Sequence, residues 1–269
     1  MSITPEHEPT VQELFDLTGK RALISGASGY LGSAMARALA EAGASVIVSS
    51  RELARAQAVA DELPKRQGVS HTAVAIDHMD TASIEKGFAQ ALEMAGGVDV
   101  LVNNGHAVLA NDWTDVTPEQ FSRHLANATG YFTLARLVRN LAVERGKPAS
   151  IIMLGSMYGL VGSYPDAYAG AVPASPVAYH TLKGGIIHLT RHLAIYWAPD
   201  RVRVNCLSPG PFPSPKANPE MVKRLCTHSP MERMGLPHEL KAAVVFLASD
   251  GSSYMTGQNL VIDGGWTAW

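Results

Sequence analysis

The sequence has little of several features that mark other classes of protein. Only two cysteines occur among 269 residues, Cys206 and Cys226, which predicts unpaired thiols rather than a disulfide framework. Lysine and arginine total 22 against 24 aspartates and glutamates, so no basic stripe is available for nucleic acid. No apolar run approaches the ~20 residues that span a bilayer, and the first ten residues contain no signal-peptide core. We therefore expect a cytoplasmic protein with no nucleic-acid or membrane partner.

What the chain does have is a regular alternation of strand-like and helix-like segments. Helices are predicted at 31–42 and 52–63, and a capping box with proline at its first helical position opens another at Thr117 that runs towards Glu144. Short apolar strands are predicted at 21–25, 45–49, 72–76, 98–103, 150–154, 203–207 and 259–262. Alternation of this kind predicts an α/β fold with one doubly wound parallel sheet and helices on both faces.

The domain organisation follows from the same pattern. Residues 1–16 are predicted to be an N-terminal extension, and 17–269 a single domain without internal repeats. Two proline-rich stretches, at about 157–178 and 211–235, are predicted as long loops, and long loops in a compact domain often border a substrate site.

Glycines mark the turn after the first predicted strand. That strand leads through Gly26-Ala27-Ser28-Gly29-Tyr30-Leu31-Gly32 into a helix. Glycines allow a tight turn and close approach of the backbone to a pyrophosphate, and the helix N-terminus offers free N–H groups. A glycine loop without a ligand is the plain alternative. The strand–turn–helix context favours a dinucleotide site, with candidate contacts from Gly26, Ser28, Gly29, Tyr30, Leu31 and Gly32.

The end of the second predicted strand bears on which dinucleotide is used. An acidic residue there would bind the ribose 2′-hydroxyl of NAD, and the run from Val46 to Arg51 contains none. Arg51 with Ser49 and Ser50 could instead hold a 2′-phosphate. We predict that NADP(H) is preferred, with NAD(H) possible if Arg51 is only a solvated side chain.

A second group of residues can move a proton on and off an alcohol oxygen. Tyr179 and Lys183 are four residues apart and would share one face of a helix, and Ser156 follows a predicted strand. A neighbouring cation favours the phenolate, which brings a phenol closer to the pKa that acid–base catalysis needs. The Tyr-x-x-x-Lys spacing by itself is also typical of a solvated helix face.

Taken together, these motifs resemble the classical short-chain dehydrogenase/reductase family from about Leu17 to Gly265. The resemblance is carried by the residues already named and by Asp77-His78-Met79-Asp80, Asn103-Asn104-Gly105, Asn127-Ala128-Thr129-Gly130, Arg203-Val204-Asn205, Ser208-Pro209-Gly210, and the tail from Thr256 to Gly265. It implies a single Rossmann-type NAD(P)-binding domain. It also implies a homodimer or homotetramer built through the two helices that start near Thr117 and Tyr179.

The family resemblance also implies roles for single residues. Tyr179 would protonate the developing alkoxide, Lys183 would lower the pKa of Tyr179 and bind the nicotinamide ribose, and Ser156 would hold the carbonyl oxygen. Asn127 would hold a water in a proton relay. The implied cofactor contacts further along the chain are Asp77, His78, Asn104, Gly105, Tyr179, Lys183, Pro209, Gly210 and Ser214. For Asn127 and Ser214, a purely structural polar role stays open.

Two motifs depart from the family pattern. The glycine turn reads Gly-x-x-Gly-x-x-Gly, with Tyr30 in place of the expected second glycine, a spacing typical of the branch that includes sugar-nucleotide epimerases. Asn-Asn-Ala-Gly is expected after the fourth strand, and this chain has Gly105 and His106 at the last two positions. Both changes lie where the phosphates and the nicotinamide are expected.

The substrate is predicted only as a class. The segment before Tyr179 is about ten residues longer than is usual in the family, and its Tyr158 and Tyr168 could bind a hydroxyl-rich ligand or belong to an ordered surface loop. His106 is a candidate for the substrate cavity. His188 and His192 lack the further ligands of a metal site, and no metal is predicted.

We therefore predict an NADP(H)-dependent oxidoreductase that interconverts a secondary alcohol and a ketone, similar to gluconate 5-dehydrogenase-like reductases of sugars, sugar acids or polyols. A sugar-nucleotide epimerase or dehydratase with retained NAD, and a non-catalytic dinucleotide sensor, are the alternatives.

Overall fold

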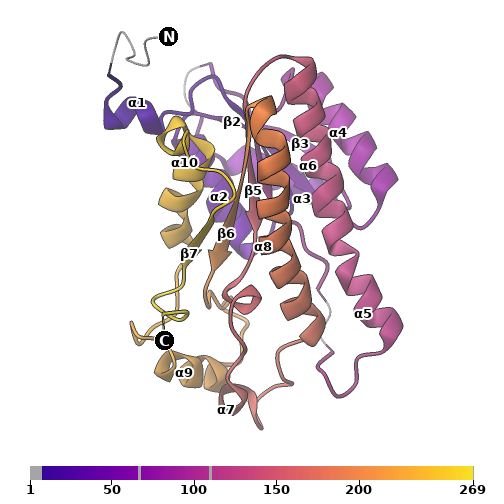
Figure 1. Cartoon of the computed structure of the whole chain (residues 1–269), viewed down its shortest axis with the longest axis vertical. Coiled ribbons are helices and arrows are strands. Elements are labelled where there is room, and N and C mark those ends of the chain that lie inside the picture. Colours follow the sequence, from indigo (N-terminus) through magenta and orange to yellow (C-terminus); the bar gives the residue numbers. More distant parts are fainter. Residues whose placement is uncertain (1–7, 66–67, 109–110, 269) are drawn as a thin grey trace.

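A seven-stranded parallel sheet forms the centre of the molecule (Figure 1). The computed structural model describes residues 8–65, 68–108 and 111–268. The strands are β1 (Arg21–Ile24), β2 (Ser45–Ser50), β3 (Thr72–Ala75), β4 (Val100–Asn103), β5 (Ala149–Leu154), β6 (Val202–Pro209) and β7 (Asn259–Ile262). They lie in the order β3-β2-β1-β4-β5-β6-β7, and every neighbouring pair is parallel. The predicted parallel sheet is confirmed.

Helices cover both faces of this sheet, as the apolar composition of the strands requires. The helices of eight or more residues are α2 (Tyr30–Glu41), α3 (Leu53–Glu62), α4 (Thr81–Ala95), α5 (Pro118–Leu125), α6 (Asn127–Glu144), α8 (Val177–Trp197), α9 (Pro219–Thr227) and α10 (Lys241–Ala248). On one face, α2, α3 and α10 pack through residues such as Met35, Ala56 and Val244. On the other, α4, α6 and α8 pack through residues such as Phe88 and Leu134. Strand β5, next to the middle strand β4, is buried along its whole length.

The predicted helix from Thr117 towards Glu144 is divided in two. Ala126 separates α5 from α6, and the side-chain amide of Asn127 donates to the carbonyl oxygen of His124 at 2.7 Å. One turn later Gly130 lies so close to the chain that an added Cβ would meet the carbonyl oxygen of His78 at 2.0 Å. This junction brings the first turn of α6 against the loop after β3.

The two predicted long loops contain short helices that contact each other beyond the carboxyl ends of the strands. The first loop contains η1 (Met157–Gly159) and α7 (Pro165–Tyr168), and the second contains α9; Figure 1 shows α7 and α9 side by side below the sheet. Asp166 accepts a hydrogen bond from His228 at 2.9 Å, and Trp266, 1% exposed, packs against Tyr164. The C-terminal segment therefore closes one side of this end of the molecule.

The opposite end of the molecule carries the N-terminal helix. Helix α1 (Val11–Phe15) is capped by Thr10, which forms a capping box with Glu13. Phe15 contacts Phe246 of α10 at a ring-centroid distance of 6.1 Å. Within residues 8–65, 68–108 and 111–268, no helix has the length and apolarity needed to span a membrane.

Candidate active site

The site lies where the strand order reverses, beside the carboxyl ends of β1 and β4. From β1 the chain proceeds to β2 and β3 on one side, whereas β4, β5 and β6 lie on the other. The loops that leave neighbouring strands there turn to opposite faces and leave a crevice between them, the usual ligand site of open parallel sheets.

The predicted glycine turn forms one wall of that crevice. Gly26 has a φ of +63°, which side chains other than glycine rarely adopt, and its Cβ position lies 2.8 Å from the Cα of Gly105. A Cβ on Gly32 would lie 2.4 Å from the carbonyl oxygen of Gly26. These two glycines are therefore fixed by backbone packing between β1, α2 and the loop after β4.

Helix α2 begins directly after this turn. Gly29 is its N-cap and supplies no side-chain hydrogen bond, so the first N–H groups of α2 remain available for an anion such as a phosphate. Tyr30, at the position where the family pattern expects glycine, is the first helical residue and is 39% exposed. The unusual glycine spacing thus leaves the amino end of α2 intact.

The end of β2 borders a cavity of about 250 Å³ next to the glycine turn. Ser28 and Ser50 approach each other there with their hydroxyl oxygens 3.0 Å apart, and the exposed Arg51 lines the cavity. Arg55, one helical turn further, lines it as well, a second cation that our sequence analysis missed although its four-residue spacing from Arg51 was visible. Glu52, the acidic residue of this lining, is 3.8 Å from Arg55.

The loop after β3 explains the departure at Gly105. The imidazole of His78 is buried, and a Cβ on residue 105 would lie 2.9 Å from its Nδ1 atom. Asn104 donates to the carbonyl oxygens of Ser25 and Gly26 at 3.0 and 3.1 Å, which ties β4 to the glycine turn. Position 105 therefore holds glycine and not alanine because the imidazole of His78 occupies the space that a methyl group would need.

Asp77, one of the implied cofactor contacts, shapes the turn after β3. Its carboxylate accepts a hydrogen bond from the backbone N–H of Met79 at 3.0 Å. The residues on either side of it, Ile76 and His78, line the 250 Å³ cavity.

Ser156, Tyr179 and Lys183 come together on a neighbouring cavity of about 440 Å³. Ser156 follows β5 and caps η1, and the other two lie on α8. The Lys183 ammonium donates to the carbonyl oxygen of Leu154 at 2.7 Å and lies 5.6 Å from the centroid of the Tyr179 ring. The predicted trio is therefore assembled from two separate elements around one opening.

Burial governs the acidity of this group. It lowers the pKa of Lys183 to about 8, because the low-polarity surroundings disfavour the ammonium. It raises the pKa of Tyr179, an effect that the hydrogen bond with Ser156 partly offsets. Burial of the phenol is the dominant influence on the pKa of Tyr179, and the expectation that Lys183 lowers this pKa stays a prediction.

The side chain of Asn127 is fully engaged in the protein. Its oxygen accepts from the Ala107 N–H at 2.8 Å and from the His78 imidazole at 2.6 Å, and its amide donates to the carbonyls of Ala107 and His124. Burial lowers the pKa of His78, which favours the neutral ring. Asn127 thereby fastens the loop after β4 to α6.

The remaining predicted residues lie in three different places. Pro209, Gly210 and Ser214 line the 440 Å³ cavity, and a Cβ on Gly210 would lie 2.5 Å from the Cα of Asp263. Tyr158 and Tyr168 are outside that lining; their hydroxyls bond to each other at 2.6 Å, and the Tyr158 ring stacks on His180. His106 lines both cavities, which also share Gly29 and Asn104.

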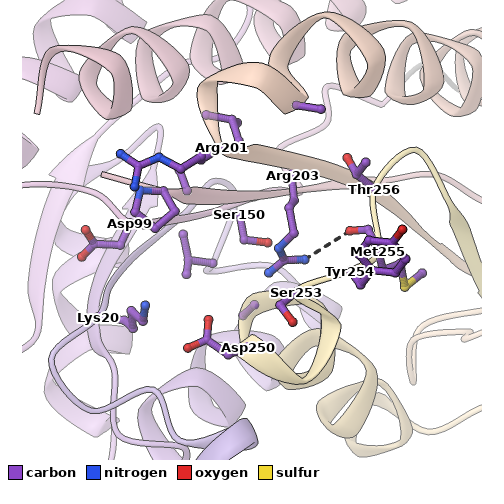
Figure 2. A pocket seen from close by; sticks show the side chains of 16 residues that line it. Lys20, Asp99, Ser150, Arg201, Arg203, Asp250, Ser253, Tyr254, Met255 and Thr256 are labelled. Atoms are coloured by element: carbon purple, nitrogen blue, oxygen red, sulfur yellow. Dashed lines mark hydrogen bonds between the residues drawn. The ribbon is translucent and has the colours of Figure 1, made fainter. Parts of the chain in front are cut away.

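A larger cavity, of about 690 Å³, lies at the amino ends of β4, β5 and β6 (Figure 2). Arg203 projects into its wall but donates to Ser252 at 2.8 Å and to the carbonyl oxygens of Ser249 and Met255. Arg203 therefore connects β6 to the segment that follows α10. Within the described ranges, no group of three or more histidines, cysteines or acidic residues is placed to hold a metal.

Comparison with known proteins agrees with this geometry. A family model described as enoyl-(acyl carrier protein) reductase matches residues 26–267. A glucose 1-dehydrogenase of Gluconobacter oxydans (strain 621H) is 32% identical over 255 residues, which cover 93% of this chain and 92% of that one. An NADP-dependent mannitol dehydrogenase of Alternaria alternata is 34% identical over 274 residues, 99% of each chain.

Solved structures show the same likeness over nearly the whole chain. A gluconate 5-dehydrogenase from Burkholderia cenocepacia J2315, in complex with NADP and tartrate, has a TM-score of 0.85 at 27% identity and covers 97% of this chain and 100% of its own. A short-chain type dehydrogenase/reductase from Mycobacterium marinum has a TM-score of 0.86 at 35% identity, with coverage of 97% and 100%.

The fold and the site define a dinucleotide-dependent oxidoreductase with a Rossmann-type sheet. The chain belongs to the short-chain dehydrogenase/reductase family, among relatives named as dehydrogenases of glucose and mannitol.

The crevice fits the family's dinucleotide. The uncapped start of α2 suits a pyrophosphate, the 250 Å³ cavity lies on the Arg51 side, and the 440 Å³ cavity lies on the Tyr179 side. Because the two cavities share lining residues, one elongated molecule can reach both ends.

Proposed function

We propose that the protein interconverts a secondary alcohol and a ketone on a sugar, sugar acid or polyol, with NADP(H) as the preferred cofactor. The observation that carries this proposal is the convergence of Ser156, Tyr179 and Lys183 on one wall of a crevice suited to a dinucleotide. When bound, the nicotinamide supplies or accepts the hydride.

The three side chains divide the remaining work. Tyr179 gives a proton to the carbonyl oxygen as its negative charge develops, and in the other direction removes it from the alcohol. Ser156 donates a hydrogen bond to the same oxygen, a preorganised contact worth about 3 kcal/mol in the transition state. Lys183, with a pKa of about 8, can exchange a proton near neutral pH, and its charged form favours the phenolate.

Two features support the preference for NADP(H). Arg51 and Arg55 line the cavity at the end of β2, where guanidinium groups can bind a 2′-phosphate. The carboxylate of Glu52, whose negative charge would oppose a phosphate, is paired with the guanidinium of Arg55. The expected result for Arg51→Glu is a roughly tenfold or larger rise in the Michaelis constant for NADPH and little change for NADH. An NADPH constant equal to that of the wild type would refute the role of Arg51.

The proposed substrate class rests on the names of the relatives, which specify glucose, mannitol and gluconate. The test is a panel of ketoses, keto acids and simple ketones followed at the NADPH absorbance, and the matching polyols followed with NADP. We expect the highest kcat/KM for a hydroxylated ketone.

Tyr179→Phe tests the chemistry itself. Because the proton donor is removed while the ring stays, kcat should fall about 10²- to 10⁴-fold and the dissociation constant of NADPH should stay close to that of the wild type. Near-normal turnover in this variant would overturn the proposal. NAD that survives purification would instead favour an epimerase or dehydratase, and NADPH binding without turnover on the whole panel would favour a sensor.

A further inference from the structure

Two histidines stand beside Tyr179 in an arrangement that the reaction described above does not use. The ring centroid of His106 is 5.4 Å from that of Tyr179 and 5.0 Å from that of His124, in edge-to-face arrangements. The Nε2 atoms of the two imidazoles are 3.4 Å apart. His106 lines the catalytic cavity, whereas His124, on α5, is 3% exposed and lies behind it.

Burial favours the neutral form of both imidazoles. Burial lowers the pKa of His106 to about 3, with further contributions from the positive charge of Lys183 and from His124. Burial also lowers the pKa of His124. A neutral imidazole has one N–H donor and one acceptor nitrogen, so that the Nε2–Nε2 contact requires one ring to donate to the other.

The buried partner decides which ring donates. The Nδ1 atom of His124 is buried without a hydrogen-bond partner, and an unpaired buried N–H is rarer in proteins than an unpaired acceptor. The less costly tautomer of His124 therefore carries its proton on Nε2 and donates it to His106. His106 then carries its own proton on Nδ1, for which no partner exists among the described residues.

We propose that His106, held in this tautomer by His124, is a specificity-determining residue that donates a hydrogen bond from Nδ1 to a hydroxyl group near the reacting carbon of the substrate. The proposal rests on the proposed function and narrows it to α-hydroxy ketones and the corresponding vicinal diols. Tyr179 and His106 line the same cavity. When the carbonyl oxygen of a substrate contacts Tyr179, the carbons next to the carbonyl therefore lie beside His106. A hydroxyl on such a carbon would give the His106 N–H the acceptor that the protein lacks.

The local backbone is built to hold this pair in place. His106 follows Gly105, which packs against His78, and the next residue, Ala107, is fixed through both its N–H and its carbonyl by Asn127. Asn127 also donates to the carbonyl of His124. The side-chain amide of Asn127 thus fixes the backbone next to His106 and that of His124. A binding group needs such rigid support to hold its donor in one position.

The test compares two ketones that differ in one hydroxyl, 1-hydroxy-2-butanone and 2-butanone, with NADPH. The measured quantity is the ratio of their kcat/KM values in each variant. His106→Phe keeps a ring but removes the donor, so the ratio should fall about 10- to 100-fold. His106→Asn restores an N–H donor and should recover part of that loss. His124→Phe removes the group that fixes the tautomer and should give a smaller fall in the same direction.

His180→Phe is the matched control. Its ring centroid is 6.5 Å from that of Tyr179, close to the 6.4 Å of His124, but it stacks on Tyr158 and is not part of the cavity lining. The ratio should therefore remain at the wild-type value. The dissociation constant of NADPH, measured for every variant, verifies that the crevice is intact.

The two proposals fail in different ways. If the wild type reduces both ketones and the ratio is the same in His106→Phe, the role of His106 is refuted and the oxidoreductase function stands. If His180→Phe lowers the ratio as much as His106→Phe, the effect is general to the region and the assignment is again refuted. If the wild type turns over no carbonyl or polyol of the panel, the proposed function itself fails.

Discussion

At the amino ends of β4, β5 and β6 the sheet borders a cavity of about 690 Å³, whereas the carboxyl end of β5 borders a cavity of about 440 Å³. Each cavity contains a buried or half-buried cation in its wall. Arg203 donates to the carbonyls of Leu247, Ser249 and Met255 and to the Ser252 hydroxyl. The ammonium of Lys183 donates to one carbonyl, that of Leu154.

The difference shows why volume is a poor guide to function. In the larger cavity the side chains of Asp99, Arg201 and Arg203 already bond to the protein, and none of the lining residues is among the described buried side chains with an unpaired polar atom. Around the smaller one, burial lowers the pKa of Lys183 to about 8 and the nearby His124 keeps an unpaired ring nitrogen. Perturbed and under-bonded groups at one opening mark the reactive end of the sheet.

The largest effect is expected from a substitution of Lys183. Lys183→Met should lower kcat by about 10²-fold or more, because Tyr179 loses the neighbouring proton-exchanging group. The free energy of unfolding should stay the same or rise, since a buried cation is replaced by an apolar side chain of similar length. Turnover at the NADPH absorbance and urea denaturation measure the two quantities. Wild-type kcat in this variant would remove the distinction between the two cavities.

Arg203→Met is the matching change at the amino end. Several acceptors around the end of α10 lose their donor, so the free energy of unfolding should fall by about 1–3 kcal/mol. The kcat of the folded protein should equal that of the wild type. Arg191→Met, at an exposed position of α8, serves as the control and should leave both quantities unchanged. A loss of kcat without a loss of stability in Arg203→Met would give the larger cavity a catalytic role.

The free energy of unfolding should depend on pH through the buried Lys183. Because the pKa of Lys183 is lowered from 10.5 to about 8 in the folded protein, the unfolded chain binds more protons between these values. Stability should therefore rise with pH from about 8 towards 10.5, and this contribution is lost as the pH falls through 8. At about 1.36 kcal/mol per pKa unit the full effect is roughly 3 kcal/mol.

Urea unfolding at pH 7.5 to 9.5 measures this slope, with Lys183→Met as the reference that lacks the group. The difference between the two proteins should grow in favour of the wild type as the pH rises. A difference that is constant across this range would mean that Lys183 titrates at its ordinary pKa.

Several parts of the structure were predictable because their signals are local in the chain. The strands lie within a few residues of their predicted bounds, as β7 at Asn259–Ile262 shows, because alternation of apolar and polar segments directly reflects a sheet covered on both faces. The four-residue spacing of Tyr179 and Lys183 places both on one helix face and on one cavity.

Other features depend on contacts between distant segments, which no local pattern records. The hydroxyls of Tyr158 and Tyr168 bond to each other, and both residues lie outside the lining of the 440 Å³ cavity, so their contact with a substrate stays a prediction. Asn127, at the start of α6, bonds to His78 and Ala107 and so joins this helix to two separate loops.

By itself the sequence determined the parallel sheet, the glycine turn and the identity of the proton-transfer side chains, since each depends on residue type and spacing over a few positions. The pKa values of these side chains depend on the tertiary structure. Burial, which results from everything packed around a group, raises the pKa of Tyr179 and lowers that of Lys183. The contact between His106 and His124 also depends on the tertiary structure, because it joins the loop after β4 to α5, two segments that are separate in the sequence.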